Sequence, residues 1–225
     1  MVMQDNICIL IPSYNEARTI GGIVKDLHAR HLDVYVVDDG STDETASKAR
    51  DEGATVIVHK KNMGKGASLI EGFQYILKKN FGAIIVMDGD RQHRVEDIEV
   101  FLKEFAETGA DIIIGNRMLD ISSMPYIRIL TNKFMSGLIS RITGQLIPDT
   151  QCGFRLIKSE VLRSVQLRSL HYDIESELII KAARQGFKIG SVPIKTVYQG
   201  EVSRINPVVD TLRFIWLMVR LSLKR

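Results

Sequence analysis

The stretch IIVMDGDRQH, residues 84–93, begins as a run of aliphatic side chains and ends in two carboxylates one residue apart. The apolar run lacks polar alternation, which is typical of a β-strand covered on both faces of its sheet. Residues two apart on an extended chain point the same way, so Asp88 and Asp90 would face one ligand. Their mutual repulsion favours either a bound cation or a polar turn that caps the strand.

Similar runs recur through the first half of the chain, separated by segments of helical periodicity. They are ICILI (7–11), VYVVD (34–38), TVIVH (55–59), AIIVMD (83–88) and DIIIG (111–115). Strands that alternate with helices indicate βαβ units and a mainly parallel sheet, so we predict a doubly wound α/β half over about the first 115 residues. Beyond it, the pattern predicts a helix at 125–143, a strand at 153–158, a helix at 173–185 and short strands within 187–198.

Composition places the chain among ordinary globular proteins. With 225 residues, 45% hydrophobic and 25% charged, it is long enough for one sizeable core and is not of disordered type. A net charge of +3 is too small to indicate nucleic-acid binding, and no apolar stretch reaches the length of a membrane span. Cys8 and Cys152 stand far apart without a CxxC pattern, so we expect neither zinc nor a disulfide, and a cytoplasmic location.

A polar motif follows each predicted parallel strand. The motifs are PSYNEA, DDGSTDET, HKKNMGKGAS, DGDRQH and GNR, in chain order. Ligands of open α/β sheets bind at the carboxyl ends of the strands, where these motifs would converge. The sequence therefore predicts a binding site at one sheet edge.

Two of these motifs allow more than one interpretation. Ser41 to Asp43 fit a helix N-cap, whereas the adjacent Asp38 and Asp39 need hydrogen bonds from a base or ribose, or from backbone amides. KNMGKGAS lacks the spacing of a P-loop, because His59 and Gly66 stand where glycine and Ser or Thr are required. It remains either a glycine-rich turn or a cationic loop that approaches an anion.

The acidic loop after residue 86 predicts a metal site. Asp88, Asp90 and the amide of Gln92 are hard oxygen ligands, which suit Mg²⁺ or Mn²⁺ better than zinc. Arg117, at the end of the fifth strand, is a candidate phosphate clamp, whereas Lys133 fits a solvated helix face.

Taken together and in order, these motifs resemble family 2 glycosyltransferases of the GT-A fold. The likeness rests on IPSYNEA, VVDDGSTDET, N-x-G-K-G, MDGDRQH, GNR, DTQCGFR and ESELIIKAARQGFKIGSVPI, and it covers roughly residues 6–200. The nearest branch is similar to dolichyl-phosphate mannose or glucose synthases and related polyprenyl-phosphate glycosyltransferases. The resemblance implies a Rossmann-like nucleotide-diphospho-sugar transferase fold, with a mainly parallel twisted sheet flanked by helices, over residues 1–205.

The resemblance also implies roles for individual residues. Donor contacts are expected at Pro12, Tyr14, Glu16, Asp39, Lys65, Asp88, Gly89 and Asp90, with Mg²⁺ or Mn²⁺ at Asp88, Asp90 and Gln92. Acceptor contacts are expected at Arg117, Arg128, Asn132, Gly153, Phe154, Arg155 and Arg204. Catalytic roles fall on Asp88, Asp90, Arg117, Asp173 and Glu175. Gly89 departs from the alanine that is common in the synthases.

The implied reaction is metal-dependent, inverting transfer of a hexose from a nucleoside diphosphate sugar, of GDP-mannose or UDP-glucose type, to a polyprenyl or dolichyl phosphate. A hydroxyl acceptor would instead need a general base, with Asp173 or Glu175 as candidates. A non-catalytic nucleotide-sugar-binding module is a further alternative. The expected partners are donor, lipid acceptor and the cytoplasmic membrane surface, not nucleic acid, with a homo-oligomer or a separate membrane-anchoring partner also open.

The segment at 206–225 predicts an amphipathic helix. Asn206 can cap it and Pro207 can occupy its first turn. Arg213, Arg220 and Lys224 form a basic stripe beside an apolar face. This pattern is typical of a helix in a membrane interface, and the alternative is a helix packed on the domain or in a dimer.

Overall fold

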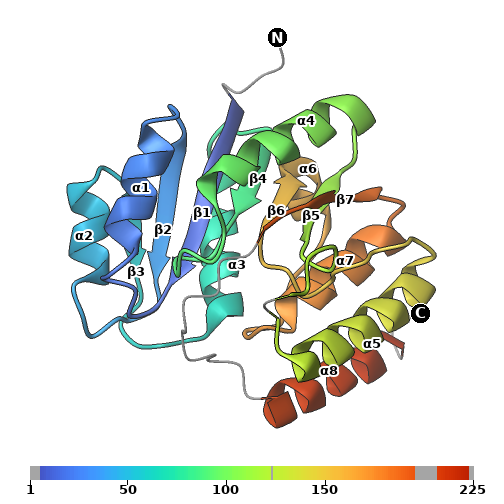
Figure 1. The fold of residues 1–225 in the computed structure, drawn as a ribbon. Coiled ribbons are helices and arrows are strands. Elements are labelled where there is room, and N and C mark those ends of the chain that lie inside the picture. Colours follow the sequence, from blue (N-terminus) through green and yellow to red (C-terminus); the bar gives the residue numbers. More distant parts are fainter. Residues whose placement is uncertain (1–5, 123, 196–206, 223–225) are drawn as a thin grey trace.

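The computed structural model describes residues 6–122, 124–195 and 207–222 (Figure 1). A seven-stranded sheet runs in the order β3-β2-β1-β4-β6-β5-β7 with helices on both faces. The strands are β1 (Ile7–Ser13), β2 (Asp33–Asp38), β3 (Thr55–Val58), β4 (Ala83–Val86), β5 (Ile112–Asn116), β6 (Arg155–Lys158) and β7 (Ile189–Pro193). The helices are α1 (Ile20–His28), α2 (Thr45–Asp51), α3 (Lys65–Ile76), the short η2 (Val95–Asp97), α4 (Ile98–Thr108), α5 (Tyr126–Thr143), α6 (Ser159–Ser164), α7 (Ile174–Arg184) and α8 (Pro207–Ser222).

One strand runs against the others. β1, β2, β3 and β4 pair in parallel, as do β5 and β7, whereas β6 lies antiparallel between β4 and β5. The carboxyl ends of β4 and β5 therefore lie at the same edge as the start of β6. Residues just before β6 join the polar loops of the parallel strands at that edge.

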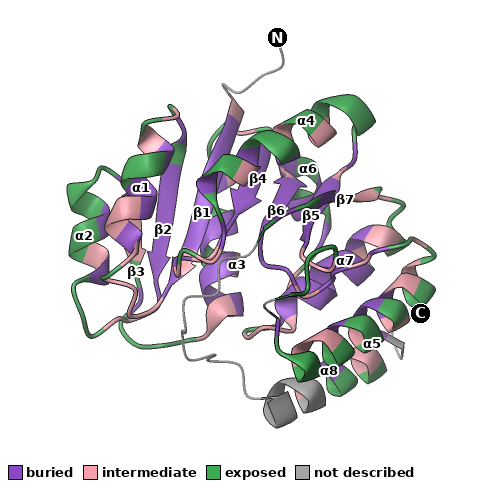
Figure 2. Cartoon of the chain, in the orientation of Figure 1, coloured by how far each residue is buried: buried purple, intermediate pink, exposed green. Residues whose placement is uncertain are grey.

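The core is built as the uniform apolar runs predict. Residues Cys8 to Ile11 of β1 and Ile84 and Ile85 of β4 are fully buried, because helices cover both faces of the sheet (Figure 2). In α1 the predicted inward positions Ile20, Ile23, Val24 and Leu27 are all buried. The mainly parallel α/β prediction is confirmed, with boundaries that shift by one to three residues.

Helix α5 buries polar as well as apolar side chains. Its buried residues are Asn132, Ser136 and Ile139. The exposed apolar side chains are Tyr126, Ile127, Leu130, Phe134 and Ile142, and Tyr126 and Phe134 are 79% and 69% exposed. Asn132 and Ser136 lie inward because they hydrogen-bond to buried polar groups of the following loop.

Helix α8 packs on the domain with Phe214, Leu217 and Leu221, and it leaves Ile215, Trp216 and Val219 exposed. Of the two placements that the sequence leaves open, packing on the domain is present in the structure. Arg220 of the predicted basic stripe takes part in it, because its guanidinium lies 3.0 Å from the buried Glu177 carboxylate of α7. Across the described ranges, no helix combines the length and apolar content needed to cross a bilayer.

Candidate active site

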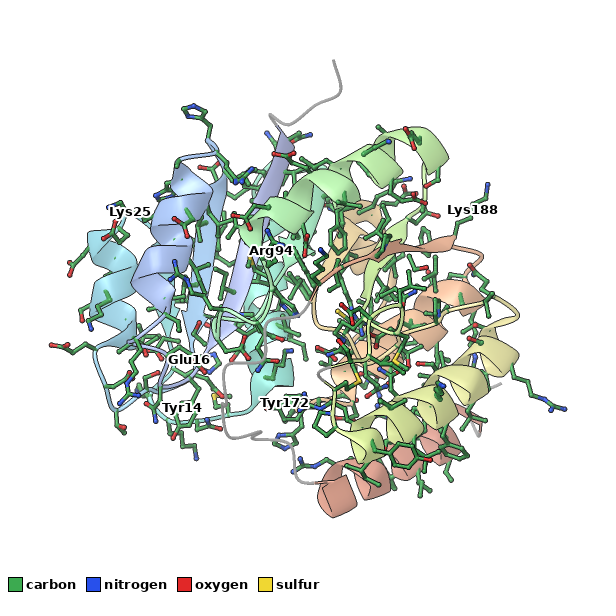
Figure 3. The ribbon with its side chains drawn as sticks, in the orientation of Figure 1. Tyr14, Glu16, Lys25, Arg94, Tyr172 and Lys188 are labelled. Atoms are coloured by element: carbon green, nitrogen blue, oxygen red, sulfur yellow. The ribbon has the colours of Figure 1, made fainter. Side chains whose placement is uncertain are left out.

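The predicted functional edge carries most of the candidate residues. Figure 3 shows Tyr14, Glu16 and Tyr172 toward the end of the molecule to which the arrowheads of β1 and β2 point. Lys25 and Lys188 lie toward the opposite end. The loops after the parallel strands therefore gather as the topology requires.

The loops after β1 and β2 are tied together by side chain to backbone hydrogen bonds. Asn15, with a positive φ of 53°, receives the Thr42 backbone N–H on its Oδ1 at 2.8 Å, and its own N–H bonds to Ser41 Oγ at 2.8 Å. The Glu16 N–H bonds to Thr45 Oγ1 at 2.8 Å. Tyr14 and Glu16 are thus held half-buried beside the β2 loop, and Pro12 is half-buried at the end of β1.

Asp39 shapes a neighbouring loop. Its two carboxylate oxygens accept the Met63 and Gly64 backbone N–H groups at 2.8 Å, and Oδ1 also lies 2.7 Å from His59 Nδ1. Asp38 accepts from Ser41 in the same turn. The hydrogen bonds from backbone amides that the sequence allowed are therefore present at both carboxylates.

The glycines of the third loop seat the start of α3. A Cβ on Gly64 or Gly66 would lie 2.4–2.6 Å from atoms of residues 169–171, so only glycine permits this approach. The Ala67 N–H bonds to the Leu170 carbonyl at 3.2 Å. Lys65 is thereby fixed at the first turn of α3, with its side chain toward the acidic loop.

Lys65 joins two carboxylates from distant parts of the chain. Its Nζ lies 2.6 Å from Asp88 Oδ1 and 2.8 Å from Glu175 Oε1, and the Glu175 side chain is 9% exposed. Burial alone would raise the pKa of Asp88, but the Lys65 ammonium lowers it to about 2. Burial would lower the pKa of Lys65, and the two carboxylates instead raise it above its ordinary value.

The His93 imidazole holds the backbone of the acidic loop at Asp88. The Asp88 backbone N–H donates to His93 Nδ1 at 3.2 Å, and the imidazole stacks on Phe154 with ring centroids 5.0 Å apart. Burial lowers the pKa of His93 to about 4, so the ring is neutral at pH 7 and accepts at Nδ1. His93 therefore orients the loop rather than supplying charge to it.

The predicted metal ligands lie on one short turn. Asp90 Oδ1 accepts the Gln92 backbone N–H at 3.0 Å, and Arg91 between them has a positive φ of 63°. Within the described residues no cluster of three or more His, Cys, Asp or Glu side chains could hold a metal ion. The predicted set of Asp88, Asp90 and Gln92 is not such a cluster, because its third member is an amide. Its carboxylate and amide oxygens are donors that fit a hard divalent cation.

Arg117 is oriented by a residue that the sequence did not single out. Its Nε and one terminal nitrogen lie 2.7 and 2.9 Å from the two oxygens of Asp149, which is 1% exposed. Asn132 Nδ2 donates to Asp149 Oδ1 at 2.6 Å. Burial raises the pKa of Asp149, and the bonds from Arg117 and Asn132 bring it below its ordinary value. Asp149 thus gathers two predicted acceptor residues.

All three residues of the GFR segment are buried, and its glycine lies beside the pair of Lys65 and Asp88. A Cβ on Gly153 would lie 2.8 Å from both Asp88 Oδ2 and Lys65 Nζ, so Gly153 borders the ion pair. Phe154 and Arg155 are 0% and 2% exposed. The Arg155 guanidinium donates to the backbone carbonyls of Thr150, Cys152 and Glu175 at 2.7–2.8 Å. The structure thus places both side chains below the predicted acceptor surface.

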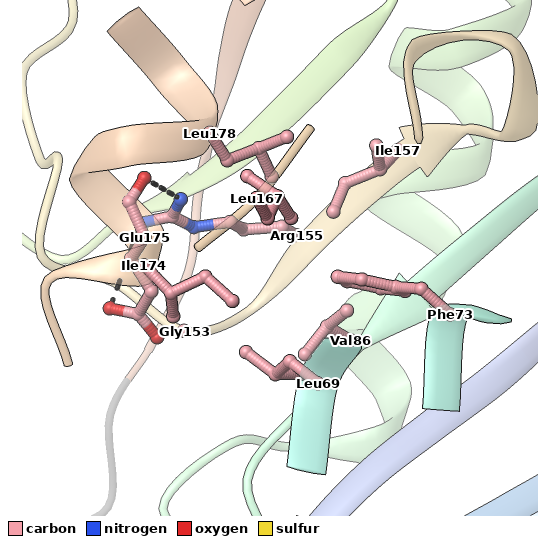
Figure 4. A pocket seen from close by; sticks show the side chains of 10 residues that line it. All are labelled: Leu69, Phe73, Val86, Gly153, Arg155, Ile157, Leu167, Ile174, Glu175 and Leu178. Atoms are coloured by element: carbon pink, nitrogen blue, oxygen red, sulfur yellow. Dashed lines mark hydrogen bonds and ion pairs between the residues drawn. The ribbon is translucent and has the colours of Figure 1, made fainter. Parts of the chain in front are cut away.

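Beneath Gly153 lies a small apolar cavity of about 10 Å³ (Figure 4). Leu69, Phe73, Leu178, Arg155 and Glu175 are among its lining residues. This volume admits at most about one water molecule, so the cavity belongs to the packing under the site and not to a substrate pocket.

The remaining candidates lie nearby or outside the described ranges. Asp173 is the residue before α7, and Glu175 is in its first turn. Arg128 is half-buried on α5, one helical turn before Asn132. Arg204 falls outside the described residues. Sequence reasoning missed Asp149 and His93, although both occur in quoted motifs, because neither motif separates ligand-binding from supporting side chains.

Comparison with known sequences identifies relatives over most of the chain. A family model described as glycosyl transferase family 2 matches residues 8–166. Glycosyltransferase AglJ of Haloferax volcanii is 31% identical over 93% of this chain and 70% of its own length. A UDP-N-acetylglucosamine–dolichyl-phosphate N-acetylglucosaminyltransferase of Methanococcus voltae is 28% identical, over 85% and 86%. Dolichol-phosphate mannosyltransferase of Pyrococcus furiosus is 27% identical, over 97% and 74%.

Solved structures share the architecture. Mannosyl-3-phosphoglycerate synthase from Rubrobacter xylanophilus matches with a TM-score of 0.75 and 21% identity, over 98% of this chain and 73% of its own. Glucosyl-3-phosphoglycerate synthase from Mycobacterium tuberculosis, in complex with Mn²⁺, UDP and its product, matches with a TM-score of 0.73 and 18% identity, over 96% and 79%. At these identities the likeness establishes the fold, which is the GT-A fold.

Proposed function

The chain belongs to glycosyl transferase family 2, and on that premise we propose that it transfers a hexose from a nucleoside diphosphate sugar to a polyprenyl or dolichyl phosphate, with inversion. The names of the relatives from M. voltae and P. furiosus support a lipid phosphate acceptor. The observation that carries the proposal is that Lys65 pairs with Asp88 at the sheet edge where Arg117 follows β5, close enough for its charge to act on Asp88. Both anionic substrates need cations at this edge.

The donor end of the site is formed by the loops after β1 to β4. Tyr14 and Glu16 would border the nucleoside, held there by the bonds to the β2 loop. Asp39 would act by shaping the loop before Lys65, and Lys65 would face the diphosphate. This assigns Asp39 a positioning role in place of direct base or ribose contact.

Asp88, Asp90 and Gln92 would hold Mg²⁺ or Mn²⁺, and the Mn²⁺ and UDP bound by the M. tuberculosis enzyme support this choice. When bound, such an ion offsets the negative charge that grows on the departing diphosphate. The turn at Arg91 brings Gln92 back toward Asp90. His93 holds the backbone of Asp88 in place.

The acceptor end is formed by Arg117 and the adjoining face of α5. Asp149 fixes the guanidinium of Arg117, so it can orient a phosphate without first ordering its own side chain. Arg128 would extend this end along α5, and the buried Asn132 would help to hold Asp149 in place. An ionised phosphate needs no general base, which is compatible with a Glu175 carboxylate already paired to Lys65.

Helix α5 supports a peripheral membrane location. Its exposed apolar residues are accompanied by Arg128, Lys133 and Arg141, and the helix contains no acidic residue. Apolar side chains beside cations fit a lipid surface with anionic headgroups. Helix α8 adds the exposed Ile215, Trp216 and Val219. We infer contact with the cytoplasmic leaflet, where the acceptor phosphate would be presented.

The reaction can be tested with purified protein, Mn²⁺, dolichyl phosphate and radiolabelled GDP-mannose, UDP-glucose or UDP-N-acetylglucosamine. Label should enter the lipid fraction with one donor, and Asp90→Ala should abolish transfer while retaining the thermal midpoint. Asp51→Ala, which removes an exposed carboxylate at the end of α2, should leave transfer unchanged.

Two results would contradict the proposal. Transfer to a soluble hydroxyl acceptor, with none to lipid, would favour the alternative in which Glu175 or Asp173 acts as a base. Nucleotide-dependent thermal stabilisation without turnover on any acceptor would favour a non-catalytic binding module.

A further inference from the structure

Lys65 already occupies the acidic centre of the candidate donor site as a built-in cation. Its Nζ lies within 2.8 Å of both Asp88 and Glu175, and its side chain is only 14% exposed. Asp88 is one of the residues to which the metal site is assigned above. The protein's own ammonium and a divalent ion would therefore compete for the same carboxylate.

Neighbouring guanidinium groups are engaged elsewhere. Arg155 donates to three backbone carbonyls, and one of its terminal nitrogens lies 3.8 Å from the Glu175 side-chain carboxylate. Arg117 is paired through two nitrogens to Asp149. Lys65 is thus the side chain that offsets the charge of Asp88 at close range, with Asp90 adding a further carboxylate on the same loop.

The surroundings confine Lys65 to a short range of movement. Gly64 and Gly66 press against residues 169–171, which fixes the backbone at the start of α3. The absence of a side chain at Gly153 provides the space in which the ammonium and Asp88 meet. Lys65 can therefore leave Asp88 by rotation of its own side chain, while Glu175 still holds it from the other side.

We propose that Lys65 excludes a bare divalent ion from the donor site and releases Asp88 only to a cation that arrives with the donor diphosphate. The inference rests on the proposed function, because it requires a metal-bound nucleotide donor. A bare cation meets the ammonium and is repelled by it. A cation that carries a diphosphate brings an anion, which gives Lys65 a replacement partner for Asp88. Lys65 thereby makes metal binding depend on the donor.

This proposal predicts that Lys65→Met gains affinity for bare Mn²⁺ and loses affinity for Mn²⁺ with nucleotide. Lys65→Met should bind Mn²⁺ alone about tenfold more tightly than the parent protein, because Asp88 and Glu175 then lose the ammonium that pairs with both of them. The same variant should bind Mn²⁺ with GDP or UDP less tightly, because the diphosphate loses its contact with Lys65. Free Mn²⁺ measured by electron paramagnetic resonance reports both affinities without any turnover.

Lys61→Met is the matched control, since it removes the same charge from an exposed position in the same loop. Its Mn²⁺ affinities should equal those of the parent. If Lys65→Met does not fold, Glu175→Gln can be compared with Lys65→Met/Glu175→Gln. The double variant leaves one unpaired carboxylate fewer than Lys65→Met does, because residue 175 then carries a neutral amide. The double variant should then show the tighter binding of bare Mn²⁺.

The outcomes separate the two proposals. Parent protein that binds Mn²⁺ with nucleotide, together with an unchanged or weaker affinity of Lys65→Met for bare Mn²⁺, overturns the exclusion role alone. Parent protein that binds no Mn²⁺ with any nucleotide contradicts the metal-dependent donor site itself, and with it both proposals.

Discussion

Gly153 lies directly against the two charged side chains at the centre of the candidate site. Because a Cβ there would lie 2.8 Å from both members of the Lys65–Asp88 pair, Gly153→Ala must displace one of them. We expect about a hundredfold loss of transfer, since small misplacements in an active site have effects of that size. Initial rates with labelled donor measure it.

Gly137→Ala is the matched control for that change. Gly137 is exposed on α5, and a methyl group added there would meet no described atom within 4 Å beyond its own stretch of helix. Alanine there should stabilise the protein by up to about 1 kcal/mol and leave transfer intact. Equal transfer by Gly153→Ala and the parent would contradict the close approach inferred at Gly153.

Asp149 should stabilise the folded protein through its ion pair with Arg117. Asp149→Asn leaves Arg117 facing an amide in a buried position, which should lower the free energy of unfolding by about 3 kcal/mol. Urea unfolding measures the loss. Glu99→Gln, which removes the exposed partner of the half-buried Arg30, should cost less than about 1 kcal/mol. Equal costs for the two variants would show that Arg117 does not depend on Asp149.

Motif reasoning located the site but not the depth of each side chain. Asp88 and Lys65 could be predicted, because strand ends and a glycine-rich loop determine where they lie. Arg155 could not be placed, because its burial depends on pairing with Val86 of β4 and Ile114 of β5. Those pairs arise from the direction of β6, which residue types do not specify.

Helix α5 exposes large apolar side chains that should bind a lipid surface. Its Ile127 and Phe134 are 66% and 69% exposed, so replacing both with serine removes apolar surface without opening the core. Binding to anionic phospholipid vesicles should weaken by more than about tenfold, since each large apolar side chain contributes about 1.5–3 kcal/mol when buried. Vesicle sedimentation measures the change, at an unaltered thermal midpoint.

The matched control for this pair is Thr131→Ser/Gly137→Ala, which alters two exposed positions of α5 and leaves its large apolar side chains in place. Vesicle binding should be retained in the control. Equal binding by the apolar variant and the parent would assign the exposed face of α5 to some other contact.

The junction between α7 and α8 should respond to acid. Burial raises the pKa of Glu177, but bonds from Lys181 and from the Arg168 and Ser169 N–H groups bring it below its ordinary value of 4.5. Arg220 of α8 also lies against this carboxylate. The stabilisation is therefore complete above about pH 4.5 and is lost as pH falls through the lowered value.

Trp216 is the single tryptophan of the sequence and stacks on Arg220 at 4.9 Å, so its fluorescence reports this junction. We expect its emission to shift on acidification before circular dichroism is lost, and to be shifted already at pH 7 in Glu177→Gln. The exposed Glu160→Gln should behave as the parent. Coincident fluorescence and dichroism transitions in the parent would contradict a local release.

Periodicity identified nearly every helix and strand that borders the site, because uniform apolar runs and three- to four-residue spacing persist in the folded chain. It could not foresee that Asn132 and Ser136 of α5 are buried, since they find their partners only in the loop at 149–150. It also could not foresee the direction of β6. Both depend on contacts between distant segments.

At the scale of the whole molecule, the first turn of α7 serves two ends of the protein. Glu175 holds Lys65 of the donor site, and two residues later Glu177 holds Arg220 of α8. If donor binding shifts this turn, it must change how α8 is held. Vesicles and Mn²⁺ with nucleotide should then alter each other's affinity by one common factor, which titration in both orders can measure.

The short spacing between these two glutamates has a consequence for how the enzyme would sense its surroundings. The first turn of α7 moves as one unit. A displacement of α8 at a lipid surface would therefore be passed through Glu177 and Glu175 to the donor site, and no intervening loop would have to fold. Glu177→Gln should abolish that reciprocity while leaving each ligand able to bind by itself. The affinity of this variant for its donor would then no longer depend on whether the protein is bound to a lipid surface.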